Sequence, residues 1–73
     1  MRVKIKLETM KDAVDFSNIT ESLPGTIVIK DLQGLCVNAK SLLGVLHSLE
    51  FEEIWCESEK DIYNKIERFV VIE

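Results

Sequence analysis

The sequence predicts a small α+β domain, an open-faced two-layer sandwich in which short antiparallel strands form one layer and helices cover one face of it. Two patterns lead to this fold class. Residues 2–7 alternate strictly between cationic and apolar side chains, which is typical of a strand with one solvated face. In residues 62–70 apolar side chains recur at helical spacing instead, which is typical of an amphipathic helix. The elements between these two complete the order β-α-β-β-α-β-α.

The first half of the chain is predicted to continue from its strand into a helix and a second strand. Thr9 and Asp12 have the spacing of a capping box, which opens the helix. An apolar stripe runs along this helix, at Ala13, Phe16, Ile19 and Leu23. Pro24 and Gly25 stop it. The β-branched residues in 26–30 then predict the second strand.

The middle of the chain is predicted to turn back and enter a second helix. Residues 31–34 (Asp-Leu-Gln-Gly) have the composition of a turn, and residues 35–37 return as the third strand. Asn38 offers a side-chain oxygen to the free N–H groups of a helix over about residues 39–48. Apolar side chains recur at helical spacing along it, at Leu42, Val45, Leu46 and Leu49.

The last part of the chain is predicted to form a fourth strand and a third helix. Residues 51–56 form the strand, in which Ile54 and Cys56 share one face and Trp55 takes the other. Ser58 and the aspartate three residues later have capping-box spacing. They are expected to begin the third helix, whose inner stripe is Ile62, Ile66, Phe69 and Val70.

Length and composition predict a single globular domain over residues 1–73. Hydrophobic residues make up 47% of the chain and charged residues 30%, which is a globular rather than a disordered composition. The net charge of −4 argues against nucleic acid or an anionic membrane as a partner, because both attract a basic surface. The N-terminus has the pattern of a strand rather than a signal peptide, and no apolar run could span a bilayer, so we expect a cytoplasmic protein.

The cysteines and the histidine predict neither a metal site nor a cofactor. Cys36 and Cys56 lie on different predicted strands, and two cysteines without a secretory signal favour reduced thiols packed as small apolar groups. They do not form a C-x-x-C pair. His47, the single histidine, has no second ligand at a recognised spacing.

Residues 37–46 carry the most specific motif in the chain. Val-Asn-Ala-Lys-Ser is followed by two leucines, Gly44 and two further apolar residues. This motif resembles the segment around the regulatory serine of HPr, the phosphocarrier of the bacterial sugar phosphotransferase system (PTS), and is especially similar to catabolite-repression HPr homologues. The resemblance implies a four-stranded antiparallel sheet with three helices on one face, over essentially the whole chain.

The residue that makes HPr a phosphocarrier is absent from this chain. In the family a Gly-apolar-His-x-Arg-Pro motif follows the first strand, and its histidine receives phosphate from phosphoenolpyruvate through an upstream enzyme. Matching backwards from Ser41 without gaps places Met10 at the histidine, Asp12 at the arginine and Ala13 at the proline. Residues 1–35 contain no histidine, and a thioether cannot carry phosphate. We therefore predict neither a phosphohistidine carrier nor an enzyme.

Ser41 occupies the position of the regulatory serine of the HPr family. There a dedicated HPr kinase phosphorylates this serine, and the product binds a transcriptional regulator as a corepressor. The residues themselves leave two roles open, a phosphorylation site or a hydroxyl that supports the start of a helix. A phosphate on Ser41 is expected to meet Lys40 and the free amides of the first helical turn.

Leu42, Leu43 and Leu46 match the apolar positions that members of the HPr family expose to their partners. Leu42 and Leu46 also fit the inward stripe of the helix, whereas Leu43 lies off it and is the best candidate for an exposed contact. Together with Lys40 and His47 they form the predicted partner-binding surface. His47 departs from the family, since continuing the match needs an extra residue there, and we expect it to be solvated at the carboxyl end of the helix.

These patterns together predict a non-catalytic, HPr-like regulatory or adaptor protein that acts through protein contacts. One alternative is a PTS phosphocarrier component that uses an unusual acceptor, either Cys36, Cys56 or Ser41. Another is a diverged interaction module that no longer meets any of these partners.

Overall fold

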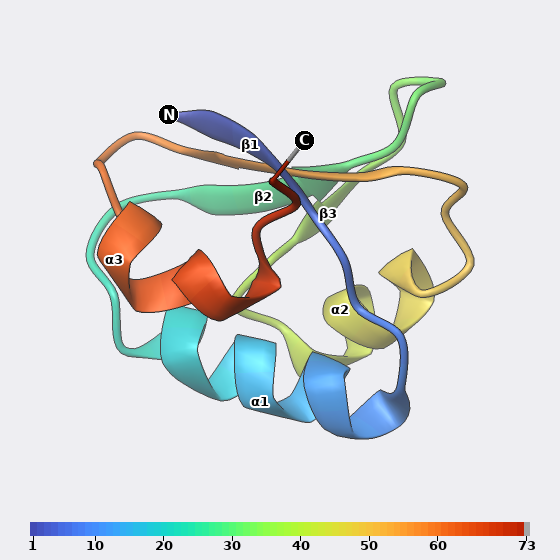
Figure 1. Cartoon of the computed structure of the whole chain (residues 1–73), viewed down its shortest axis with the longest axis horizontal. Helices are drawn as coiled ribbons and strands as arrows, with labels where there is room; N and C mark the ends of the chain where they lie inside the picture. The colour runs from blue at the N-terminus through green and yellow to red at the C-terminus, as the bar shows by residue number, and fades with distance from the viewer. Residues whose placement is uncertain (73) are drawn as a thin grey trace.

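The computed structural model describes residues 1–72 and confirms the predicted fold class. The strands are β1 (Arg2–Ile5), β2 (Ile27–Lys30), β3 (Cys36–Asn38) and β4 (Ile54–Ser58). The helices are α1 (Met10–Glu21), α2 (Leu42–Ser48) and α3 (Tyr63–Ile66), and a 3₁₀ turn, η1 (Glu67–Phe69), follows them. The strands pair antiparallel in the order β1-β4-β2-β3, and the helices lie on one face of the sheet (Figure 1). This arrangement is compatible with the open-faced β-sandwich of HPr. No helix in residues 1–72 is long and apolar enough to cross a membrane.

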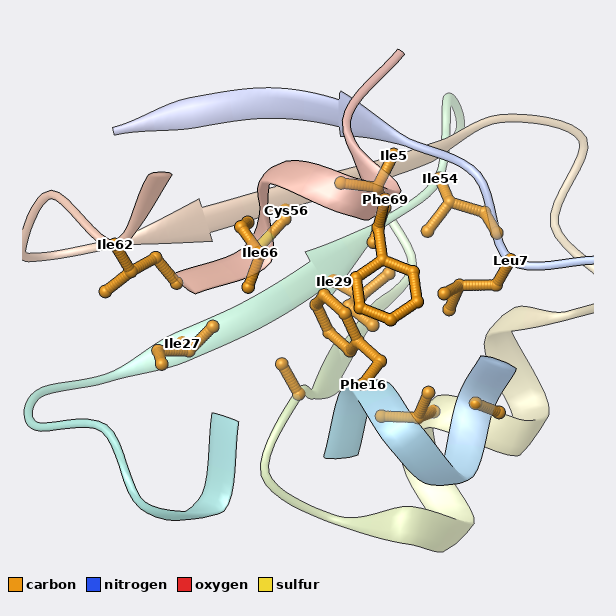
Figure 2. Packing of buried hydrophobic residues seen from close by; sticks show 13 residues of the cluster. Ile5, Leu7, Phe16, Ile27, Ile29, Ile54, Cys56, Ile62, Ile66 and Phe69 are labelled. Atoms are coloured by element: carbon orange, nitrogen blue, oxygen red, sulfur yellow. The ribbon is translucent and has the colours of Figure 1, made fainter. Parts of the chain in front are cut away.

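The hydrophobic core lies between the sheet and the helices. The two central strands contribute alternate, fully or almost fully buried residues: Ile27, Ile29, Ile54 and Cys56. Phe16 of α1 packs edge to face against Phe69 of η1, with 5.3 Å between the ring centroids (Figure 2). Ile54 and Cys56 thus share the inner face, as the alternation along the fourth strand predicts, and Trp55 faces away from the core.

Helix α1 begins at the predicted cap. Thr9 is the N-cap, and the Asp12 amide donates to its Oγ1 at 3.1 Å. The Asp12 carboxylate accepts from the amide of Glu8 at 3.0 Å, one residue before the position that a capping box uses. The helix ends at Glu21, so Pro24 lies beyond its last turn.

The predicted start of the third helix is wrong. Ser58 still pairs with Ile27 in the sheet, and its hydroxyl donates to the Lys60 carbonyl instead of capping a helix. Helix α3 begins later, after Ile62, without a side-chain cap. Val70 lies outside the helix as well, in an antiparallel bridge to Ile5, although the rest of the predicted stripe is buried.

The open face of the sheet carries paired charges. The Arg2 guanidinium lies 4.1 Å from the centroid of the Trp55 ring. Glu57 accepts from Lys30 and Arg2, with a nitrogen–oxygen distance of 3.2 Å to each. The hydrogen bond from Lys30, and secondarily that from Arg2, lowers the pKa of Glu57. The carboxylate at the centre of this face is therefore compensated by two cations.

Candidate functional site

The connection from β3 to α2 places Ser41 differently from the prediction. Helix α2 begins at Leu42 rather than at residue 39, and Ser41 is its N-cap. The amide of Gly44 donates to Ser41 Oγ at 3.2 Å. Asn38 does not cap the helix, because it still pairs with Val28 in the sheet. Its side-chain oxygen instead accepts from the Lys40 amide at 2.9 Å and tightens the turn between strand and helix.

Gly44 allows the first turn of α2 to lie directly against the end of β3. A Cβ at this position would lie 2.8 Å from the Asn38 carbonyl oxygen and 3.5 Å from the Cβ of Val37. Backbone atoms cannot move aside as a flexible side chain can, so only glycine fits without displacing the helix. The glycine of the motif thereby sets the position of Ser41 relative to the sheet.

The Lys40 ammonium contacts the chain just beyond α1. Its Nζ donates to the Leu23 carbonyl at 2.6 Å, at the carboxyl end of α1, and its side chain is partly buried. Leu23 lies two residues beyond the last residue of α1, so the bond joins Lys40 to the segment that follows the helix. Lys40 therefore connects the segment before α2 to the chain that follows α1, and its role in partner binding stays a prediction.

The leucines of α2 separate into exposed and packed residues. Leu42 is 44% exposed and Leu43 79% exposed, so both are accessible beside Ser41, which is itself half-buried. Leu46 packs against the core. His47 is exposed in the last turn, as predicted, with its ring centroid 6.3 Å from that of Phe51. The structure thus brings Ser41, Leu42 and Leu43 together and places His47 one turn away from Leu43.

Met10 is the first residue of α1 and is 68% exposed. It lies where the sequence match places the family's histidine, at a helix start. Its thioether has no proton to exchange and no nitrogen nucleophile, so this position cannot accept a phosphoryl group. In the described part of the chain, no three His, Cys, Asp or Glu residues gather as metal ligands.

The two cysteines lie in contrasting environments. Cys56 is fully buried, and desolvation by burial raises the pKa of its thiol to about 11. Cys36 is exposed, so the prediction that both thiols are packed is wrong for this one. It lies on β3, a short edge strand, opposite Lys30 on the open face of the sheet. The Cys36 thiol is therefore accessible to solvent and the Cys56 thiol is not.

Substitution of Ser41 tests its role as the cap of α2. Ser41→Ala removes the acceptor for the Gly44 amide, and we expect a loss of about 1 kcal/mol of unfolding free energy. In a domain of this size that lowers the melting temperature by about 4–8 °C. Ser41→Asp keeps an N-cap oxygen and should melt close to wild type. Thermal unfolding followed by circular dichroism measures both, and a collapse of Ser41→Asp would contradict the assignment of Ser41 as an accessible cap.

The site is assigned from the N-cap position of Ser41, the exposure of Leu42 and Leu43, and the motif in residues 37–46. No family model matches the chain, and no curated protein or solved structure matches it. The assignment of a function is accordingly a proposal built on Ser41, Leu42 and Leu43.

Proposed function

We propose that this chain is an HPr-like regulatory or adaptor protein of the PTS, active in the cytoplasm in carbon catabolite repression. It binds proteins rather than nucleic acid or membranes, and it is neither a phosphohistidine carrier nor an enzyme. Its binding surface is the start of α2, and phosphorylation of Ser41 switches that surface between partners.

The observation that carries this proposal is the exposure of Leu42 and Leu43 directly beside Ser41. Two large apolar side chains next to a hydroxyl form a small docking surface. This surface changes from neutral to negatively charged when the hydroxyl gains a phosphate. The HPr-type order of strands and helices supports the same interpretation. Met10 at the expected histidine position supports a regulatory role over a carrier role.

The expected effect of phosphate on Ser41 is local. Phosphorylation adds about −1.5 to −2 charges at the N-terminus of α2, where unpaired amides favour negative charge. The Lys40 ammonium already donates one hydrogen bond to the Leu23 carbonyl, so pairing with the phosphate competes with that contact. The added charge can also pair with a cationic side chain of the partner, such as the transcriptional regulator that the HPr resemblance implies.

A kinase assay tests the proposal. Wild-type protein incubated with a family HPr kinase and ATP should gain one phosphate, assigned to Ser41 by mass spectrometry, and Ser41→Ala should gain none. Leu43→Ser should lower the rate of phosphorylation, because it removes the most exposed leucine of the docking surface. Leu35→Ser, at a similarly exposed leucine of the β2–β3 turn, is the matched control and should not. Absence of phosphate on wild type, or its appearance on Ser41→Ala, would overturn the proposal.

A second candidate function is supported by the exposed thiol of Cys36. A PTS component with an unusual acceptor needs an accessible nucleophile, and Cys36 meets this condition while Cys56 does not. Incubation with phosphoenolpyruvate and the first enzyme of the system distinguishes the two functions. The regulatory function gives no label, whereas the carrier function gives label that Cys36→Ser abolishes.

A further inference from the structure

The β2–β3 hairpin and the connection from α2 to β4 lie at the same end of the molecule (Figure 1). Residues of both segments line a groove there. Its volume is about 310 Å³. Leu32 and Leu35 of the hairpin and Phe51 of the connection form its apolar lining. Leu32 and Leu35 are 58% and 57% exposed, so the hairpin presents two large apolar side chains to solvent.

The hairpin holds these leucines in fixed positions. The Asp31 carboxylate accepts from the Gln33 amide at 2.8 Å and from the Leu35 amide at 2.9 Å. The Asp31 amide also donates to the Leu35 carbonyl at 3.0 Å, and Gly34 takes the positive φ of +93° that the turn requires. The backbone of the turn is thus ordered before binding, so a partner that packs on these leucines would cost little backbone conformational entropy.

The charges at the groove are of one sign. Asp31, Glu50 and Glu52 line it beside the imidazole of His47, and no lysine or arginine among residues 1–72 does. Within residues 1–72, neither Glu50 nor Glu52 has an ion pair or a side-chain hydrogen bond. Glu57 on the open face is, by contrast, paired with two cations. The carboxylates beside the apolar lining are therefore free to pair with cations from another molecule.

We propose that this groove binds a protein segment in which lysine or arginine residues stand next to large apolar side chains. The apolar side chains of the segment pack on Leu32, Leu35 and Phe51, and its cations pair with Glu50 and Glu52. The carboxylates select against acidic segments, because like charges at the rim repel. This surface does not include Ser41, Leu42 or Leu43, so the inference does not depend on the function proposed for them.

Nuclear magnetic resonance titration of the full ¹⁵N-labelled chain tests this inference. The probe is a capped synthetic decapeptide in which lysine and leucine alternate. When this peptide is added, the changes in the backbone amide shifts of the protein should concentrate in residues 31–35 and 47–52 and should saturate. The affinity should fall as the salt concentration rises. Two matched peptides, one with glutamate for lysine and one with serine for leucine, should leave these amides unshifted.

Variants of the chain test separately the contribution of the carboxylates and that of the apolar lining to peptide binding. Glu50→Gln combined with Glu52→Gln should weaken binding of the lysine–leucine peptide by about tenfold. Leu35→Ser should weaken it as well, whereas Leu43→Ser and Glu21→Gln, both outside the groove, should not. The substituted side chains are exposed, so each variant is expected to keep the wild-type melting temperature.

Three outcomes would overturn the inference. Shifts spread over all acidic surfaces, and equal for the serine-containing peptide, would indicate charge attraction alone. Shifts confined to Leu42 and Leu43 would assign the peptide to the start of α2. Shifts at the hairpin that depend on the concentration of the chain itself, without peptide, would show that the groove is occupied by a second copy.

Discussion

Phe16→Ala is expected to lower the free energy of unfolding by about 3–5 kcal/mol. Phe16 is completely buried, and its ring packs edge to face on Phe69, so the substitution removes both apolar burial and a ring–ring contact. A chain of 73 residues has a total stability of about 4–11 kcal/mol at 0.05–0.15 kcal/mol per residue. The variant should therefore be unfolded, or close to it, at physiological temperature. Urea unfolding of wild type and variant, followed by circular dichroism, measures the difference.

Two further variants serve as controls for this prediction. Phe16→Leu retains most of the volume and should lose distinctly less stability than Phe16→Ala. Val14→Ala, at a partly exposed position of the same helix, should change the unfolding free energy by no more than about 0.5 kcal/mol. If Phe16→Ala were as stable as Val14→Ala, the packing of α1 on η1 in Figure 2 would be wrong.

The periodicity of side chains predicted which helices and strands exist, but not where α2 and α3 begin. Asn38 and Ser41 are both good N-cap residues, and only the pairing of Asn38 with Val28 in the sheet assigns the cap to Ser41. Ser58 is a similar case, since its pairing with Ile27 keeps it in β4. The pairing of Ser58 with Ile27 connects residues far apart in the chain, and the exact register of Asn38 against Val28 is not determined by the composition of the turn between them.

The candidate site could be predicted only in part for the same reason. Leu43 lies off the inward stripe of its helix, and this alone predicted its exposure. The contact of Lys40 with the Leu23 carbonyl spans 17 residues and depends on how α1 packs beside α2. The sequence patterns did not predict the groove. The two leucines in the turn Asp-Leu-Gln-Gly-Leu were a visible signal for it, because such turns usually carry polar side chains.

Thr20→Val is expected to lower the free energy of unfolding by about 1–3 kcal/mol, although the two side chains have nearly the same shape. Thr20 Oγ1 lies 2.6 Å from the carbonyl oxygen of Ala39, to which it donates, and both residues are fully buried. Valine leaves that carbonyl without its donor in a site closed to water. The residues that precede α2 then lose a contact with α1, so the amide resonances of residues 39–42 should also shift.

Two hydroxyl variants on the same helix provide the controls. Thr20→Ser keeps the donor and should retain more stability than Thr20→Val, despite the loss of a methyl group. Ser22→Ala removes an exposed hydroxyl that donates to the Ile19 carbonyl at 2.9 Å, and it should change the unfolding free energy by less than about 0.5 kcal/mol. Wild-type stability for Thr20→Val would show that the hydroxyl does not anchor the segment. In that case Lys40 alone would connect this segment by a side-chain hydrogen bond to the carboxyl end of α1, and Ser41 would be positioned by Gly44 and the sheet.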